Sequence, residues 1–180
     1  MARLSGTRPA GRATRRDHPR GSAGLNDSDA GARSYEIPPE LFSLTQVDDA
    51  GLLFISPVIH DWSIVSSSGI DTVIDLEGGL DVGVPTVPNQ VLYIYFPILD
   101  EDLPDREKLH ALASLGATLV GQGHHVLSHC GMGFNRSALV AGLILHKLGM
   151  PGPKAVERLR ERRAGALFNE RFAAWLASLG

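Results

Sequence analysis

The stretch HVLSHCGMGFNRSALVAG (residues 125–142) reads as a strand, a glycine-rich loop and the start of a buried helix. HVLSH is short and apolar, whereas SALVAGLILHKLGM (137–150) is almost wholly apolar over the length of a helix. The loop between them holds Cys130, the single cysteine in 180 residues. In an open parallel sheet, ligands bind where the carboxyl ends of strands meet helix N-termini, so this loop is the predicted functional site.

Outside this stretch, short apolar runs alternate with helical patterns. GLLFISPV (51–58), IDTVIDLE (70–77) and VLYIYFPI (91–98) are near-continuous, which is typical of strands buried on both faces of a parallel sheet. Helices are predicted in PDREKLHALASLGATLVGQG (104–123), GPKAVERLRERRAG (152–165) and NERFAAWLASLG (169–180). The first of these repeats Leu109, Leu112, Leu115 and Leu119 at spacings of three and four, and Pro104 suits its start. The predicted fold is therefore α/β, with a single central, mainly parallel sheet flanked by helices.

Charge and composition divide the chain at about residue 35. Residues 1–34 are rich in Gly, Ala, Ser and Arg without periodicity, and seven arginines against three aspartates give them a net charge of +4. This composition predicts a disordered tail, although an Arg-rich start also resembles an organellar transit peptide. Residues 35–180 carry a net charge of −7 and are predicted to form one catalytic domain. Between Ser34 and Asp105 there is no lysine or arginine, which argues against a nucleic-acid partner.

Features that the sequence lacks predict the cellular compartment of the protein and its lack of disulfides and cofactors. No apolar run approaches the roughly 20 residues of a membrane-spanning helix, and the first residues lack the apolar core of a secretory signal. One cysteine cannot form an internal disulfide, so the expected compartment is the reducing cytoplasm. The adjacent pair His124–His125 lacks metal-ligand spacing, and no metal or other cofactor is predicted. The oligomeric state is left open.

The loop after Cys130 has the features of an oxyanion site. Glycines permit its backbone N–H groups to turn inward, and a helix N-terminus adds a positive dipole. Arg136 adds a planar fork that matches two oxygens of a phosphoryl group. The predicted phosphate-binding residues are Gly131, Met132, Gly133, Phe134, Asn135 and Arg136.

The same surroundings favour a thiolate at Cys130, which makes it a candidate nucleophile. Ser137 can donate a hydrogen bond to the sulfur, and His129 can order the loop through its ring nitrogens. Taken singly, a free cysteine is usually an inert buried hydrophobic residue, and a histidine such as His129 usually has a structural role and not a catalytic one. Taken together at this spacing, the residues indicate nucleophilic catalysis.

The stretch HCGMGFNRS (129–137) resembles the His-Cys-x5-Arg-Ser/Thr signature of the cysteine-dependent protein tyrosine phosphatases, and the order of elements is most similar to the dual-specificity branch. The resemblance covers residues 35 to 180 and includes GIDTVIDLE (69–77) and VERLRERRAGALFNERF (156–172). It implies a general acid on a loop upstream. Asp100 matches that position, 30 residues before Cys130, with Glu101, Asp102 and Asp105 as competitors.

The resemblance implies a phosphomonoester hydrolase with a phosphocysteine intermediate, and the expected substrate is a protein carrying phosphotyrosine and phosphoserine or phosphothreonine. Cys130, Arg136, Asp100, Ser137 and His129 are the expected catalytic residues. The alternatives are the same chemistry on RNA 5′-triphosphate, phospholipid, carbohydrate phosphate or another small phosphomonoester, or a catalytically silent phosphate-binding module. Arginines at 158, 160, 162 and 163 suggest a solvated helix face.

Overall fold

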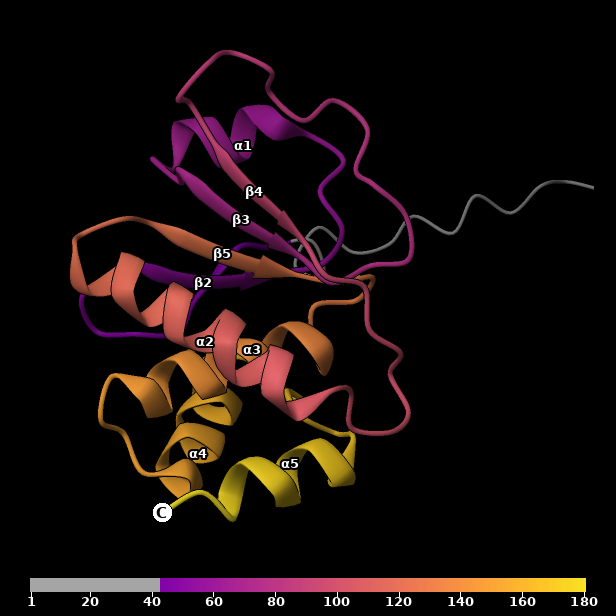
Figure 1. The fold of residues 1–180 in the computed structure, drawn as a ribbon, viewed down its shortest axis with the longest axis vertical. Helices are drawn as coiled ribbons and strands as arrows, with labels where there is room; N and C mark the ends of the chain where they lie inside the picture. Colours follow the sequence, from indigo (N-terminus) through magenta and orange to yellow (C-terminus); the bar gives the residue numbers. More distant parts are fainter. Residues whose placement is uncertain (1–42) are drawn as a thin grey trace, which may run out of the picture. The chain divides into compact units, whose positions relative to one another are not determined.

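One five-stranded sheet forms the centre of the computed structural model, which describes residues 43–180 (Figure 1). The strands are β1 (Thr45–Gln46), β2 (Leu53–Ser56), β3 (Thr72–Asp75), β4 (Leu92–Tyr95) and β5 (Val126–His129), in the order β1-β2-β5-β3-β4. Only β1 is antiparallel to its neighbour. The predicted α/β class with one mainly parallel sheet is confirmed. The predicted tail at residues 1–34 lies outside the described residues.

The register of the sheet brings three strand ends to one level. His129 at the end of β5 pairs with Ser56 of β2 on one side and with Asp75 of β3 on the other. Because these strands are parallel, the segments that follow them leave the sheet side by side. The loop after β5 is therefore flanked by the segments that begin at Pro57 and Leu76.

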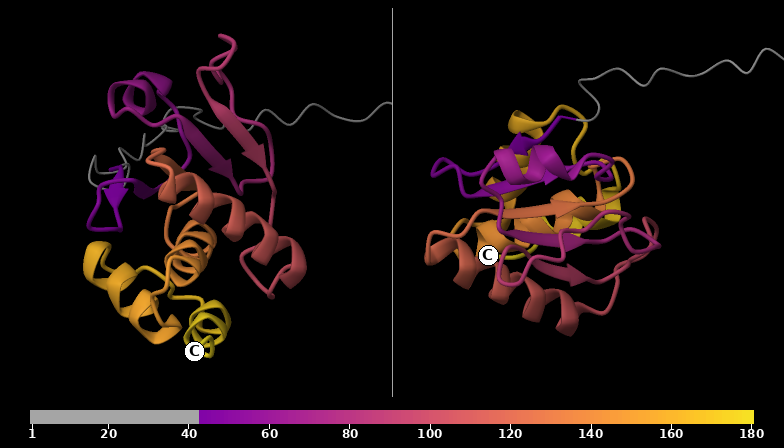
Figure 2. Two further views of the ribbon diagram at one scale, coloured as in Figure 1. Left: turned by 60° about the vertical axis from the view of Figure 1, so that its left-hand side comes forward. Right: turned by 90° about the horizontal axis from the view of Figure 1, so that it is seen from above.

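Helices cover the two faces of the sheet unequally (Figures 1 and 2). One face is covered by α1 (Trp62–Ser67), whose Trp62 and Val65 pack with Val73 and Leu127. On the other face lie α2 (Arg106–Gly121), α3 (Arg136–Lys147), α4 (Gly152–Arg162) and α5 (Glu170–Ala177). In this layer α3 packs on the sheet, and α4 and α5 pack outside it.

The apolar α3 is the centre of the larger core, as its sequence predicts. Every residue from Ser137 to Leu145 is buried. Gly142 allows α5 to approach closely, because a Cβ there would lie 2.4 Å from Leu176 Cδ2. Burial on all sides thus sets the position of α3, and the N-terminus of α3 lies near the carboxyl end of β5.

Two expectations about exposure are wrong in detail. Strand β4 is an edge strand, so Leu92 and Tyr95 are exposed instead of buried. In α2 the buried residues include Leu109, Leu112 and Val120, whereas Leu115 is exposed because the 3.6-residue period turns it outward. The helix begins at Arg106 with Asp105 as its N-cap, two residues after Pro104.

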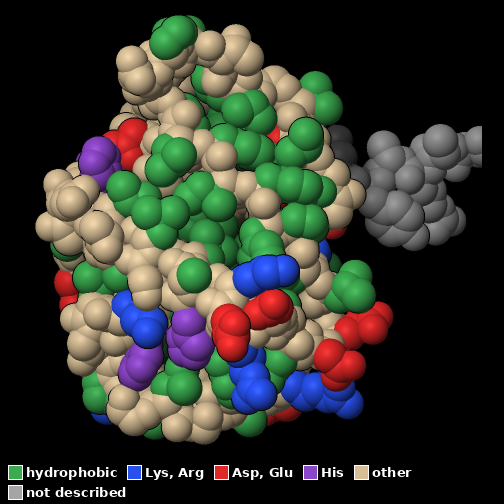
Figure 3. Space-filling view, viewed as in Figure 1, with side chains coloured by type: hydrophobic (Ala, Val, Ile, Leu, Met, Phe, Trp, Pro, Cys, Tyr) green, Lys and Arg blue, Asp and Glu red, His purple; other side chains and the backbone are tan. Residues whose placement is uncertain are grey.

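On the face seen in Figure 3, hydrophobic and charged side chains occupy different regions. Hydrophobic side chains gather over the strands, and Lys, Arg, Asp and Glu side chains gather below them, over the helices. Within residues 43–180, no helix is both long and apolar enough to cross a lipid bilayer.

Candidate active site

The loop of residues 130–135 (the signature loop) joins β5 to α3 and is held from the side by the segment after β2. The Cys130 amide donates to Ser56 O at 3.4 Å, and the Val58 amide donates to Gly131 O at 3.4 Å. Gly133 has a φ of +72°, and a Cβ there would lie 2.6 Å from the backbone of Ser56 and Pro57. A glycine is therefore required at this turn both for its conformation and for space.

The Cys130 sulfur lies at the floor of this loop. Its Sγ accepts a hydrogen bond from the Gly133 amide at 3.3 Å and lies 3.5 Å from Ser137 Oγ. The side chain is 2% exposed, and α3 begins six residues further on. The Gly133 amide and the N-terminus of α3 therefore place positive dipoles near the sulfur.

Arg136 lies over the same loop with its guanidinium turned inward. Nη1 donates to Leu76 O at 3.2 Å and to Ile98 O at 3.3 Å, and Nη2 donates to Glu77 Oε2 at 2.8 Å. The side chain is 15% exposed, so the group does not extend into bulk water. Its Nε is buried and has no hydrogen-bond partner among the described residues, which leaves a donor for a bound oxyanion.

Glu77 anchors Arg136 through the bond from Nη2, a role that no motif in the sequence indicates. Burial opposes its charged form, but hydrogen bonds from the Gly78 amide and from Arg136 outweigh burial and lower the pKa of Glu77 below its usual range. Gly131 makes the contact possible, since a Cβ there would lie 2.6 Å from Glu77 Oε2. An ionised Glu77 fixes the plane of the guanidinium.

Asp100, on the loop after β4, is tied to the signature loop by two asparagines. Asn135 Nδ2 donates to Asp100 Oδ2 at 2.9 Å, and Asn169 Nδ2 donates to Oδ1 at 3.2 Å. The Asn169 amide donates in turn to Asn135 Oδ1 at 2.9 Å, which closes the network. Asp100 is thereby held against the loop that carries Cys130.

The competing acidic residues make other contacts. Asp102 forms an exposed ion pair with Arg171. Asp105 caps α2 and accepts from the Glu107 and Lys108 amides. Glu101 contributes its carbonyl oxygen to Asn169. Of these four residues, Asp100 is the one whose carboxylate contacts the signature loop.

The sequence predicts that the ring nitrogens of His129 order the signature loop, but in the structure Nε2 faces another part of the chain. The ring is fully buried, and neither nitrogen forms a hydrogen bond within the described part of the chain. Nε2 faces two carboxylates instead, 3.0 Å from Asp81 Oδ2 and 3.6 Å from Asp75 Oδ1. Both aspartates belong to β3 and the segment after it, not to the signature loop.

Arg163 also supports the signature loop. The prediction that it lies on a solvated helix face is wrong, because it is buried. Its guanidinium lies 4.4 Å from the centre of the Phe134 ring, and Nη2 donates to Met132 O at 3.3 Å. Burial lowers the pKa of Arg163, although the charge of Cys130 acts in the opposite direction. Arg158 and Arg162 instead bind Asp49 near the surface.

Comparison with known proteins places this architecture among solved phosphatases. A mouse putative dual specificity phosphatase complexed with zinc tungstate matches with a TM-score of 0.63 at 23% identity, over 82% of this chain and 90% of that one. Human DUSP28 matches with a TM-score of 0.62 at 20% identity, over 74% and 89%. PTPMT1 in complex with PI(5)P matches with a TM-score of 0.61 at 14% identity, over 74% and 92%. No family model and no curated protein matches the sequence.

The chain therefore has the fold of the cysteine-dependent tyrosine phosphatases. Within that fold, solved structures of dual-specificity phosphatases are among those it resembles over most of their length.

Proposed function

We propose that this protein is a phosphatase that hydrolyses phosphomonoesters through a phosphocysteine intermediate. The observation that carries the proposal is the position of the Cys130 sulfur, beneath the Gly133 amide and beside Ser137, in a loop over which Arg136 is anchored by Glu77. One loop thus presents a nucleophile and an oxyanion site together.

In the first step the Cys130 thiolate attacks phosphorus, and the bond from phosphorus to the leaving oxygen breaks. The signature-loop amides and Arg136 stabilise the charge on the three equatorial oxygens. Asp100, in its protonated form, gives its proton to the leaving alkoxide or phenoxide. The products of this step are the free alcohol and a phosphocysteine.

In the second step water attacks the phosphocysteine, and the sulfur–phosphorus bond breaks. Asp100, now ionised, accepts the proton of that water, which restores the acid. The departing thiolate accepts a hydrogen bond from the Gly133 amide, and the Ser137 hydroxyl, whose Oγ lies 3.5 Å from Sγ, can rotate to donate a second one. Inorganic phosphate leaves and the resting enzyme is recovered.

The proposed substrate is a protein carrying phosphotyrosine and phosphoserine or phosphothreonine. A hollow of about 270 Å³ lies beside the signature loop and is lined by apolar residues such as Leu44, Pro57, Ile59 and Ile64. Such a surface suits an apolar side chain next to a phosphoresidue. The signature loop contains no lysine, and no lysine or arginine lies between Ser34 and Asp105 to hold a highly charged head group.

A second candidate is a non-protein phosphomonoester. It is favoured by the likeness to PTPMT1, which was solved in complex with PI(5)P. A silent phosphate-binding module is the third candidate, and the presence of both Cys130 and Arg136 argues against it.

Turnover of p-nitrophenyl phosphate under reducing conditions tests the proposed chemistry. We expect metal-independent turnover by the wild type and none by Cys130→Ser. Asp100→Asn is expected to lower kcat about 100-fold and to remove the basic limb of the pH–rate profile, because the amide cannot ionise. A wild type that binds vanadate without turnover would support the silent module. A panel of phosphopeptides, phosphoinositides and 5′-triphosphate RNA then separates the substrate classes.

A further inference from the structure

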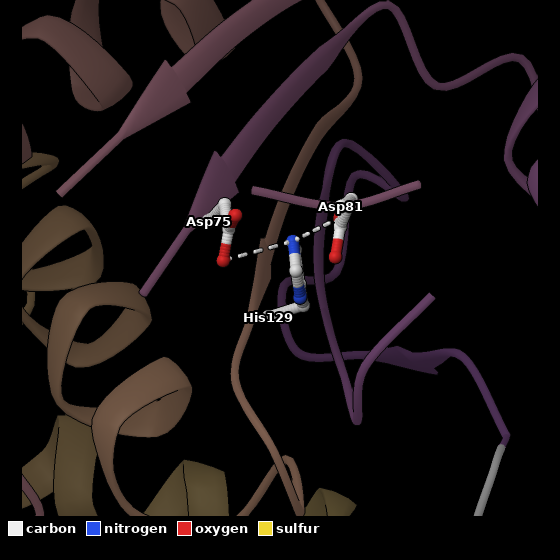
Figure 4. A group of neighbouring side chains, drawn as sticks. All are labelled: Asp75, Asp81 and His129. Atoms are coloured by element: carbon white, nitrogen blue, oxygen red, sulfur yellow. Dashed lines mark ion pairs between the residues drawn. The ribbon is translucent and has the colours of Figure 1, made fainter. Parts of the chain in front are cut away.

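Three side chains from separate parts of the chain converge behind the signature loop. Asp75 ends β3, His129 ends the neighbouring β5, and Asp81 comes from the segment after β3 (Figure 4). Their ligand atoms all lie within 4.8 Å of one another. His129 Nε2 points between the two carboxylates, as Figure 4 shows.

This cluster is buried and its polar atoms are incompletely satisfied. His129 and Asp75 are fully buried, and the Asp81 side chain is 3% exposed. Although Nε2 lies 3.0 Å from Asp81 Oδ2, both atoms lack a partner with hydrogen-bond geometry in the described part of the chain. A buried imidazole nitrogen and a buried carboxylate oxygen in this state are costly unless a cation lies between them.

The negative charges in the cluster also favour the binding of a cation. Two carboxylates this close repel one another when both are ionised and desolvated. Among the described residues, no lysine or arginine forms an ion pair with Asp75 or Asp81. Within residues 43–180, the imidazole is the single basic group that forms an ion pair with them.

A second layer of hydrogen bonds holds the Asp75 carboxylate and the backbone of Asp81. The Tyr93 hydroxyl donates to Asp75 Oδ2 and accepts from the Asp81 amide at 3.2 Å. The Glu77 amide donates to Asp75 Oδ1 at 2.8 Å. Support of this kind is typical of metal ligands.

We propose that Asp75, Asp81 and His129 bind one divalent transition-metal ion of the Zn²⁺ type. One imidazole nitrogen and two carboxylate oxygens are ligands that such ions accept, and a water would complete a four-coordinate shell. The imidazole selects against Mg²⁺ and Ca²⁺, which prefer oxygen ligands alone. The ion would bind Nε2 and neutralise both carboxylates. No step of the proposed phosphatase reaction uses this ion.

Titration of the untagged, full-length chain with Co²⁺ tests the site by its visible absorption. All measurements are made in a Cys130→Ser background, which removes the one thiolate that would compete for metal. We expect one equivalent of Co²⁺ per chain. Asp81→Asn is expected to weaken binding at least about tenfold, since it removes a ligand while Asp75 and His129 keep their places.

The matched control is His124→Gln. His124 Nδ1 lies 2.9 Å from Asp71 Oδ2 at the surface, so this pair has the same residue types but only one carboxylate. Binding should be unchanged in this variant. Equal affinities for the parent and Asp81→Asn, or loss of binding in His124→Gln, would overturn the proposal and leave a proton between the carboxylates.

Anomalous diffraction from Zn²⁺-soaked crystals gives a measurement that does not depend on the folding of a variant. A peak within coordination distance of all three side chains is expected, and its absence at saturating Zn²⁺ would contradict the site. Because the readout is binding and not turnover, a failure here leaves the phosphatase proposal intact, and the reverse also holds.

Discussion

Arg136 shows how a single residue in this site is oriented before any substrate arrives. Its two terminal nitrogens are bound by Glu77 and by the carbonyl oxygens of Leu76 and Ile98, so the guanidinium has one orientation. A planar fork held in this way loses little conformational entropy when it binds a phosphoryl group. In the proposed mechanism, Glu77 is therefore a positioning residue for Arg136.

The variant Glu77→Gln tests whether Glu77 positions the Arg136 guanidinium. We expect kcat/KM for p-nitrophenyl phosphate to fall about tenfold, and the free energy of unfolding to fall by about 1 kcal/mol at pH 7, because a charge-assisted hydrogen bond is lost. The folded-state pKa of Glu77 is lowered, so its stabilising effect is present above the unfolded pKa of about 4.3 and is lost as pH falls through the folded value. Urea unfolding at pH 7 and in acid should therefore show a difference that shrinks in acid.

The control for this variant is Glu157→Gln. Glu157 also pairs with a cation, Lys154, but both side chains are exposed. We expect activity and stability to match the wild type. A loss in Glu157→Gln equal to that in Glu77→Gln would assign the effect to charge in general and not to the anchoring of Arg136.

At the scale of elements, Asn169 joins the start of α5 to the loop after β4. Its Oδ1 accepts from the Arg171 and Phe172 amides and so caps the helix, while its Nδ2 donates to Asp100 and to Glu101 O. One amide side chain thus caps the start of α5 and ties the loop that carries Asp100 to that helix.

Substitution of Asn169 by serine or alanine separates these two roles. Serine caps a helix as well as asparagine does, so Asn169→Ser should change stability by less than about 0.5 kcal/mol, whereas Asn169→Ala should cost about 1 kcal/mol. Both lack the amide Nδ2 that donates to Asp100, and both should lower kcat with little change in KM. Thermal unfolding and steady-state kinetics measure the two effects. A wild-type kcat in Asn169→Ser would show that Asn169 does not hold the acid loop.

Across the whole domain, Arg163 connects segments that are remote in sequence. It follows α4, stacks on Phe134, binds Met132 O in the signature loop, and donates to Thr45 Oγ1 at 3.1 Å in β1. The C-terminal helices and the first strand therefore stabilise the site jointly.

Arg163→Lys should lower the free energy of unfolding by about 2 to 3 kcal/mol, because lysine cannot stack and donate in the same plane. For a domain of this size we expect Tm to fall by roughly 5 to 10 °C. The neighbouring Arg162→Lys serves as the control, since Arg162 is part of the surface pair with Asp49 and its loss should leave Tm unchanged. Equal shifts in both variants would refute the connecting role of Arg163.

The sequence predicts those features of the fold and candidate site that depend on local pattern. Apolar runs identify the central strands and α3, and the spacing from Cys130 to Arg136 identifies the loop, because both signals lie within a few consecutive residues. The supporting roles of Glu77, Asn169 and Arg163 are not contained in local pattern, because each residue acts on the loop from a distant segment. The exposure of β4 also depends on strand order, which periodicity does not contain.

The single thiol has a consequence for oxidative damage. If peroxide converts the Cys130 sulfur to a sulfenic acid, these 180 residues contain no second cysteine to form a protective disulfide. Recovery would then depend on a thiol supplied from outside, such as a small cellular reductant, reaching a sulfur that is almost wholly covered. Inactivation by peroxide should thus become irreversible quickly whenever external thiols are scarce.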